Sequence, residues 1–397
     1  MKHPIHHGGD PSGVRRRLGL GDAPLLDFSA SLNPFGPPPG AIEAAREAIG
    51  QVDRHPEPRS PRLVERLAAF HGIPADRVIV GAGTTELIGL IAQSLREVLA
   101  YHAQALGDAS KPLAHLVDPT YGEYRRVSAL NELRAQVWGE HVLGWEQDAF
   151  PEDAAGIFWT GHPDNPTGHA WDRSTLEGFV DATQGLLTIV DESFLSFLPD
   201  EDERSLVGAA ATRDNLLVLR SMTKFYGFPG LRVGYAVASP DMVTRLGQYQ
   251  DPWTVAAPAE AAALAALDDE DYRLRSVALI ARESARMLDS LWEIEGLRPA
   301  WPDRARPAGA PPLPNFLLAS LTRTDWDSAG LRDTLARRGF LVRECSDLPG
   351  LEIGALLTGP DRLVATRGHI RVAVRTPPEN DRLLAALAEV LGSDPAG

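Results

Sequence analysis

Lysine is nearly absent from this chain of 397 residues. The sequence holds three lysines, Lys2, Lys111 and Lys224, among 39 basic residues, so arginine carries almost all of the positive charge. Arginine keeps its proton and forms no imine, whereas lysine can lose its proton and bond to a carbonyl carbon. Lys224 stands in an apolar, glycine-containing segment, 221–234. This setting suggests a Schiff-base lysine, although Lys224 taken alone fits a surface loop equally well.

Cysteine, long apolar runs and net positive charge are also missing. The single cysteine, Cys345, excludes an intrachain disulfide, so we expect a reducing, cytoplasmic environment. No stretch approaches 18 uninterrupted apolar residues and the first residues form no apolar run, so we expect neither a membrane span nor a secretory signal. A net charge of −15 makes nucleic acid and anionic membranes unfavourable partners.

Strand and helix patterns alternate along the chain, which predicts an α/β fold with a mostly parallel, covered sheet. The expected strands are 77–80, 115–117, 156–160, 186–190, 216–219, 233–237, 340–343 and 370–374. The expected helices are 86–99, 174–183, one or two within 257–294, 331–338 and 379–391. The proline-rich segment 302–314 predicts a loop. We expect an N-terminal arm that shares in a small domain (1–45), a large domain (46–270) and a small C-terminal domain (271–397).

Candidate site residues follow predicted strands, at the sheet edge where ligands of such folds bind. The segment 81–86, which contains Gly83, Thr84 and Thr85, follows a strand and opens a helix. Glycine permits close backbone approach, and the N–H groups and dipole of a helix start favour an anion. The segment therefore suggests a phosphate cradle, although an ordinary turn with a threonine cap is at least as good an interpretation of it alone.

Three further residues have both a functional and an ordinary interpretation. Asp191 ends an apolar strand, where its carboxylate could hold a protonated ring nitrogen or simply cap a turn. Asn165, followed by Pro-Thr-Gly, could donate to a ring hydroxyl or form a common turn. Tyr121 could stack on a flat cofactor or pack in the core.

Together and in this order, these motifs are more specific than any one of them. The cradle, Tyr121, Asn165, Asp191 and Ser-Met-Thr-Lys at 221–224, with Arg232 eight residues later, resemble the fold type I pyridoxal-phosphate enzymes of the class I/II aminotransferase group. The resemblance implies a large domain with a mostly parallel sheet, a smaller α/β C-terminal domain, pyridoxal 5′-phosphate as cofactor and a homodimer.

The resemblance also implies a role for each matching position. Lys224 would bond to the cofactor aldehyde, Asp191 would meet the ring nitrogen, and Asn165 would meet the ring hydroxyl. Tyr121 would stack on the ring. The cofactor phosphate would be held by Gly83, Thr84, Thr85, Ser221, Thr223 and Arg232. No metal is implied.

Segments near both ends of the chain resemble a smaller group of enzymes within this family. His-Gly-Gly at 7–9, the segment 26–36, the segment 342–351 and Arg-Val-Ala-Val-Arg-Thr at 371–376 are similar to threonine-phosphate decarboxylases of cobalamin synthesis, relatives of histidinol-phosphate aminotransferases. The match covers nearly the whole chain and implies an amino acid or phosphorylated amino acid as substrate. The implied substrate contacts are His7, Gly8, Asn33, Arg343 and Arg371. Two guanidiniums suit a molecule with a carboxylate and a phosphate, although either arginine could instead serve surface pairing.

Three departures from the related sequences bear on function. His55 stands where relatives usually have a tyrosine that reaches the neighbouring subunit's cofactor, and Phe194 stands where histidinol-phosphate aminotransferases tend to have a tyrosine. The segment 352–369 is longer than expected between the two late arginines. One residue set serves both decarboxylation and transamination. The resemblance at both ends of the chain favours decarboxylation of O-phospho-L-threonine, and an aminotransferase is the alternative.

Overall fold

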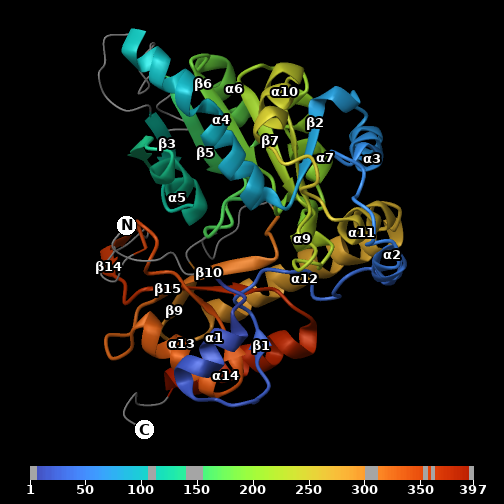
Figure 1. Ribbon diagram of the computed structural model, residues 1–397. Coiled ribbons are helices and arrows are strands. Elements are labelled where there is room, and N and C mark those ends of the chain that lie inside the picture. Colours follow the sequence, from blue (N-terminus) through green and yellow to red (C-terminus); the bar gives the residue numbers. More distant parts are fainter. Residues whose placement is uncertain are drawn as a thin grey trace.

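Two groups of elements, one above the other in Figure 1, make up the molecule. The structure, a computed structural model, describes residues 7–105, 113–139, 155–299, 312–351, 356–358 and 363–392. The upper group is built on a seven-stranded sheet from residues 78–237, and the lower group on a four-stranded sheet from residues 297–373. This arrangement is the α/β fold that the strand and helix patterns predict, with a larger and a smaller part.

The seven-stranded sheet has the order β2-β8-β7-β6-β5-β3-β4. Its strands are β2 (Val78–Gly81), β3 (Leu113–Val117), β4 (Arg134–Trp138), β5 (Gly156–Gly161), β6 (Leu186–Asp191), β7 (Leu216–Ser221) and β8 (Gly234–Val237). The strands from β4 to β7 pair in parallel, whereas β8 is antiparallel to both of its neighbours. The carboxyl ends of β3, β5, β6 and β7 therefore lie at the same edge of the sheet.

Helices cover both faces of this sheet because its strands are apolar on both faces. Along β5, Ile157 and Trp159 belong to an apolar cluster with residues of α4 (Thr84–Ala105), α5 (Gly122–Leu130) and α10 (Pro240–Tyr249). Phe158 between them points to the other face, contacts Phe179 of α6 (Arg173–Ala182) and belongs to an apolar cluster that includes residues of α3 (Pro61–His71) and α8 (Val207–Ala210). Alternation along each strand thus produces two apolar layers, one on each side of the sheet.

The smaller sheet is antiparallel, with the order β12-β15-β10-β9. Its strands are β9 (Leu297–Pro299), β10 (Phe316–Leu321), β12 (Arg343–Glu344) and β15 (His369–Ala373), accompanied by α13 (Ser328–Arg337) and α14 (Pro377–Gly392). Arg343 and Arg371 face one another as cross-strand partners in β12 and β15. Side chains of directly opposite residues share a face of the sheet, so this pairing brings two guanidiniums together.

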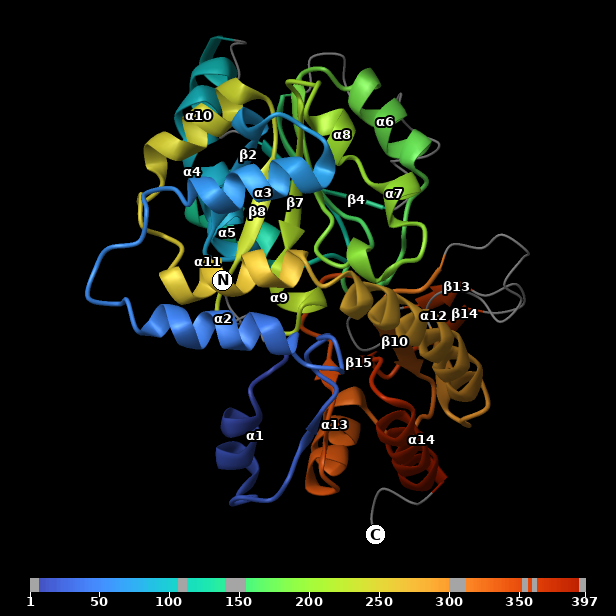
Figure 2. The same ribbon diagram turned by 90° about the vertical axis from the view of Figure 1, so that its right-hand side faces the viewer.

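Long helices and the N-terminal segment join the two groups. Figures 1 and 2 show α2 (Pro39–Ile49) beside α11 (Ala257–Leu267), and α12 (Glu270–Trp292) running from the upper group along the lower one. The N-terminal segment forms α1 (Pro11–Leu18) and β1 (Leu26–Asp27), which pairs in parallel with β11 (Phe340–Leu341) of the small part. This pairing attaches the N-terminal segment to the small part, and the predicted division into an arm, a large domain and a small domain stays a prediction.

Most predicted elements are present with shifted ends, and one is wrong. The strand predicted over 340–343 is two short strands in different sheets, because β11 pairs with β1 and β12 pairs with β15. Buried Val342 lies where the chain changes partners. The long segment 352–369 contains β13 (Leu356–Thr358) and β14 (Leu363–Ala365), an antiparallel pair. Residues 352–355 and 359–362, like most of the proline-rich loop, lie outside the described residues.

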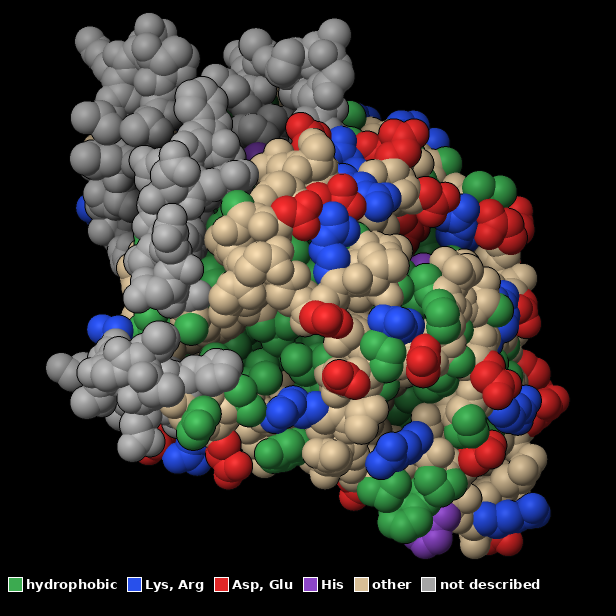
Figure 3. All heavy atoms as spheres, turned by 90° about the horizontal axis from the view of Figure 1, so that it is seen from above, with side chains coloured by type: hydrophobic (Ala, Val, Ile, Leu, Met, Phe, Trp, Pro, Cys, Tyr) green, Lys and Arg blue, Asp and Glu red, His purple; other side chains and the backbone are tan. Residues whose placement is uncertain are grey.

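The described surface carries charges of both signs. On the face in Figure 3, acidic and basic side chains of the described part are interspersed rather than gathered into one basic patch. Within the same residues, no helix combines the length and apolar character needed to cross a membrane. The described histidines, cysteine and carboxylates likewise form no group of three that could hold a metal ion.

Candidate active site

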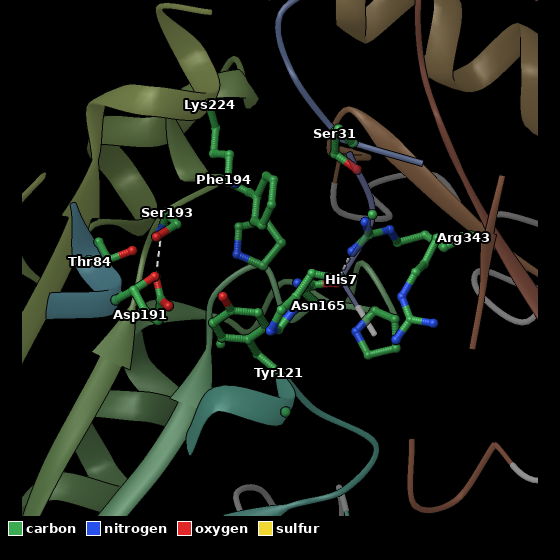
Figure 4. A pocket seen from close by; sticks show the side chains of 18 of the residues that line it. His7, Ser31, Thr84, Tyr121, Asn165, Asp191, Ser193, Phe194, Lys224 and Arg343 are labelled. Atoms are coloured by element: carbon green, nitrogen blue, oxygen red, sulfur yellow. Dashed lines mark hydrogen bonds between the residues drawn. The ribbon is translucent and has the colours of Figure 1, made fainter. Parts of the chain in front are cut away.

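A cavity lies between the large and the small part of the molecule, at the carboxyl edge of the seven-stranded sheet (Figure 4). Its large-domain wall includes Thr84, Thr85, Tyr121, Asn165, Asp191, Thr223, Lys224 and Arg232, and its other wall includes His7, Gly8, Arg343 and Arg371. The structure thus brings together most of the candidates that the sequence indicates. Gly83, Ser221 and Asn33 are the candidates that do not line the cavity.

Lys224 projects into the cavity from α9 (Met222–Phe225), the short helix that directly follows β7. Exclusion of bulk water lowers the pKa of Lys224 to about 8, and the charges of Arg371 and Arg232 act in the same direction. The nearby carboxylate of Asp191 opposes this shift. An amine whose pKa lies this near to neutrality is partly unprotonated at physiological pH, which is the state that attacks a carbonyl carbon.

Asp191 ends β6 with a buried carboxylate that faces the cavity. The Tyr124 hydroxyl donates to its Oδ2 at 2.8 Å, and the Ser193 backbone N–H donates to its Oδ1 at 2.9 Å. Burial raises the pKa of Asp191, although these hydrogen bonds partly counter the effect. A buried carboxylate without a bonded cation is stabilised by a ligand that presents an N–H⁺ group to it.

The turn before α4 has the close backbone approach expected of an anion cradle. Gly83 has φ of 84°, and a Cβ on it would lie 2.6 Å from Nη2 of Arg232. Glycine at this position therefore leaves room for the Arg232 guanidinium beside the helix start. Thr84 and Thr85 occupy the first turn of α4, where backbone N–H groups lack intrahelical acceptors. The guanidinium, the hydroxyls and these N–H groups make a site for a phosphate.

The remaining cofactor candidates flank this end of the cavity. Tyr121 lines it at the start of α5, and burial is the largest cause that raises the pKa of its phenol to about 12. Thr223 lines it as well, and its hydroxyl lies 2.9 Å from that of Ser221, which sits one step behind the wall. Asn165 follows β5 and meets the small domain, since its Oδ1 accepts a hydrogen bond from Nη1 of Arg371.

Arg371 is a buried cation on the small-domain wall. Its Nη2 donates to the Ser29 carbonyl at 2.9 Å, and its guanidinium lies 5.4 Å from the centre of the Phe316 ring. No carboxylate of the described residues lies within ion-pair distance of Arg371, and its Nε has no hydrogen-bond partner there. Burial lowers the pKa of Arg371 to about 10, and the charge of Arg343 contributes. An anionic ligand would supply the missing counter-charge.

His7 closes the other side of the cavity near its opening. Its Nε2 lies 3.0 Å from Oε1 of Glu123, a buried carboxylate that also binds Arg126. Burial would raise the pKa of Glu123, but the bonds from His7 and Arg126 outweigh it and lower the value to about 2. A Cβ on Gly8 would lie 2.0 Å from the Ser29 carbonyl, so the chain can pass here only with glycine. Glu123 thereby holds the His7 ring in place beside the cavity.

Two residues singled out by the sequence lie elsewhere. Asn33 donates to the Phe225 carbonyl and to the Ser276 hydroxyl, each at 2.8 Å, and therefore ties the N-terminal segment to α9 and α12 rather than lining the cavity. His55 is exposed and lies against Trp253, with 4.9 Å between the ring centres. Its contact with a neighbouring subunit's cofactor stays a prediction.

Sequence reasoning missed several parts of the site. The sequence alone does not identify Tyr124 as the partner of Asp191. Its position three residues after Tyr121, near the start of a helix, could have indicated that the two side chains lie close together. Phe194, noted as a departure, lines the cavity and packs edge-on against Phe316. The acceptor role of the Ser29 carbonyl had no signal in the sequence, because any residue could supply it.

Comparisons with known proteins agree with this geometry. Residues 23–305 match the family described as aminotransferase class I and II. The chain is 32% identical to threonine-phosphate decarboxylase of Salmonella typhimurium, over 97% of this chain and 96% of that one. It is 33% identical to histidinol-phosphate aminotransferase of Roseiflexus castenholzii, over 95% and 92%. The fold resembles histidinol-phosphate aminotransferase of Sinorhizobium meliloti in complex with pyridoxal-5′-phosphate, with a TM-score of 0.76, 21% identity and coverage of 98% and 95%.

The residues of the cavity fit the cofactor of this family, pyridoxal 5′-phosphate. The amine of Lys224 suits its aldehyde, the buried carboxylate of Asp191 suits its ring nitrogen, and the helix start beside Arg232 suits its phosphate. The fold type I architecture, the cofactor and the extent of the match lead to one conclusion. The chain belongs to the aminotransferase class I and II family, whose members are pyridoxal-phosphate enzymes.

Proposed function

We propose that this protein decarboxylates O-phospho-L-threonine to (R)-1-amino-2-propanol O-2-phosphate and CO₂. One observation carries the proposal: the small-domain side of the cavity holds two arginines, Arg343 and Arg371, opposite each other on paired strands. A phosphorylated amino acid offers two anions to two guanidiniums. The name of the Salmonella relative supports the same substrate.

The cavity distinguishes one end of such a substrate from the other. Arg371 lies beside Asn165, on the cofactor side, and can take the carboxylate next to the reacting carbon. Arg343 and His7 lie farther from the large-domain sheet in Figure 4 and can take the phosphate. His7 is already held by Glu123, so its ring is oriented before any ligand binds.

The chemistry itself depends on the cofactor, which supplies an electron-accepting ring conjugated to the substrate nitrogen. Arg371 would orient the carboxylate, and that orientation would decide whether the carboxylate or the α-proton is lost. In decarboxylation the carboxylate would leave as CO₂, and Lys224 would deliver a proton to the α-carbon in its place. Asp191 stabilises a proton on the ring nitrogen, because its buried carboxylate gains from a cationic neighbour.

Transamination is the second candidate, since the same residues would serve the loss of the α-proton in place of the carboxylate. The similarity to the Roseiflexus histidinol-phosphate aminotransferase extends over nearly the whole chain and favours it. Phe194 argues the other way, because its ring adds no hydroxyl to the cofactor wall where those aminotransferases tend to have tyrosine.

Product analysis separates the two reactions. We expect the cofactor-loaded protein, incubated with O-phospho-L-threonine alone, to release CO₂ over many turnovers and to accumulate the amino-alcohol phosphate. A matched incubation contains histidinol phosphate and a 2-oxo acid. No CO₂ in the first incubation, together with conversion of the 2-oxo acid to an amino acid in the second, would make the protein an aminotransferase.

A homodimer is also part of the proposal. Large apolar side chains are exposed around the paired helices α2 and α11, namely Phe35 (43% exposed), Ile49 (57%), Val52 (64%) and Trp253 (45%). Large apolar side chains that are exposed near one pair of helices are typical of an interface. We expect sedimentation equilibrium to give twice the chain mass of 42.9 kDa at micromolar concentration. A fully active protein of single-chain mass would contradict this expectation.

A further inference from the structure

The two arginines of the cavity differ in their partners. Arg371 donates to the Ser29 carbonyl and to Asn165 Oδ1, which are neutral acceptors. Arg343 is bound by a charge, because its Nη2 lies 2.8 and 3.0 Å from the two carboxylate oxygens of Asp347, and its Nη1 donates to the Glu344 carbonyl. One guanidinium therefore has its charge neutralised within the described protein, whereas the other does not.

The Arg343–Asp347 pair is built into a short turn. Asp347 follows β12 by three residues and lies four residues after its partner, so the chain itself keeps the carboxylate close. Both side chains are largely shielded from solvent, with exposed fractions of 9% for Arg343 and 14% for Asp347. Water therefore weakens their attraction less than it weakens that of a surface pair. Any anion that binds Arg343 must compete with this carboxylate.

We propose that Asp347 is a specificity-determining residue, an internal counter-anion that competes with the distal phosphate of the substrate for Arg343. The inference rests on the proposed function, in which Arg343 takes that phosphate. A phosphate carries more charge than the carboxylate and can displace it, but only at the cost of the existing pair. Ligands with no distal anion leave the pair in place. Asp347 thus weakens phosphate binding at Arg343 and leaves carboxylate binding at Arg371 unaffected.

The test is the Asp347→Asn variant of the cofactor-loaded protein, in which the cofactor's own phosphate already fills the cradle at α4. Calorimetric titration with inorganic phosphate is expected to show about fivefold tighter binding than in the parent protein. The KM for O-phospho-L-threonine is expected to fall by a similar factor, while kcat changes less than twofold. L-Threonine, which lacks the phosphate, is expected to bind equally well to both proteins.

Three variants make the comparison specific. Asp347→Ser removes the charge with a different side chain and is expected to behave like Asp347→Asn. Asp347→Glu restores the charge and is expected to restore parental phosphate binding. Asp333→Asn removes a carboxylate on α13 that is more exposed, binds Arg17 through both oxygens at 2.8 Å and also Arg332, and does not line the cavity. It is expected to leave binding unchanged.

The results separate this inference from the proposed function. Unchanged or weaker phosphate binding in both charge-removing variants would overturn the role of Asp347, whatever the reaction. Absence of CO₂ release by the parent protein would refute the decarboxylase instead, and the phosphate titration would still decide the role of Asp347, because it needs no turnover.

Discussion

Replacement of Lys224 with alanine is expected to lower kcat by about 10⁴-fold or more and to abolish the visible absorption of the protein-bound cofactor. Lys224 is the residue that combines an amine with a position near Asp191 on the large-domain wall of the cavity. In the proposed function, its loss would remove both the covalent link to the cofactor aldehyde and the proton donor for the α-carbon. Steady-state CO₂ release and an absorption spectrum of the purified variant measure the two losses separately.

Lys224→Arg is the sharper control, because arginine keeps the positive charge and much of the length but forms no imine. It is expected to be as inactive as Lys224→Ala. Arg275→Ala, on the exposed side of α12 and paired there with Asp271, is expected to keep full activity. Retention of more than about 1% of the parental kcat in Lys224→Arg would remove Lys224 from the covalent role.

The gathering of most cofactor candidates around one cavity could be predicted from the sequence, for a physical reason. Strand-end positions in a parallel sheet meet at one edge, so Asp191 after one strand and Lys224 after the next were bound to lie close together. The scarcity of lysine made Lys224 conspicuous in a chain that otherwise uses arginine. The glycine at 83 is explained by the nearness of Arg232, a pairing that the sequence order suggests but that only the fold brings about.

The substrate end could be predicted less well, because its contacts join segments far apart in the chain. Asn33 occupies a position that the resemblance assigns to substrate, yet its amide is used by the Phe225 carbonyl and the Ser276 hydroxyl. Asp347 carries no signal in the sequence, since the spacing of four residues predicts an ion pair on a helix and this segment is not one. The prediction of one strand over 340–343 is wrong for a related reason. The strands with which these residues pair are set by contacts between segments far apart in the chain.

Replacement of Asp191 with asparagine is expected to lower kcat by about 10³-fold while the protein still binds pyridoxal phosphate. The carboxylate is buried at the end of β6 and has no bonded cation among the described residues, so its charge is available to a protonated ring nitrogen. An amide of the same shape cannot stabilise that proton. Stopped assays of CO₂ release with O-phospho-L-threonine give kcat, and cofactor absorption confirms that the site is loaded.

The hydrogen bonds to Asp191 allow a graded comparison. Tyr124→Phe removes the hydroxyl that donates to Oδ2 at 2.8 Å but leaves the carboxylate, so we expect a loss of kcat of about tenfold. Burial raises the pKa of Asp191, which means that the folded chain disfavours the ionised form and loses stability as pH rises through that pKa. Asparagine carries no such cost, so the cofactor-free Asp191→Asn protein is expected to melt no lower than its parent. A kcat within tenfold of the parental value in a well-folded, loaded Asp191→Asn protein would show that the ring proton does not depend on this carboxylate.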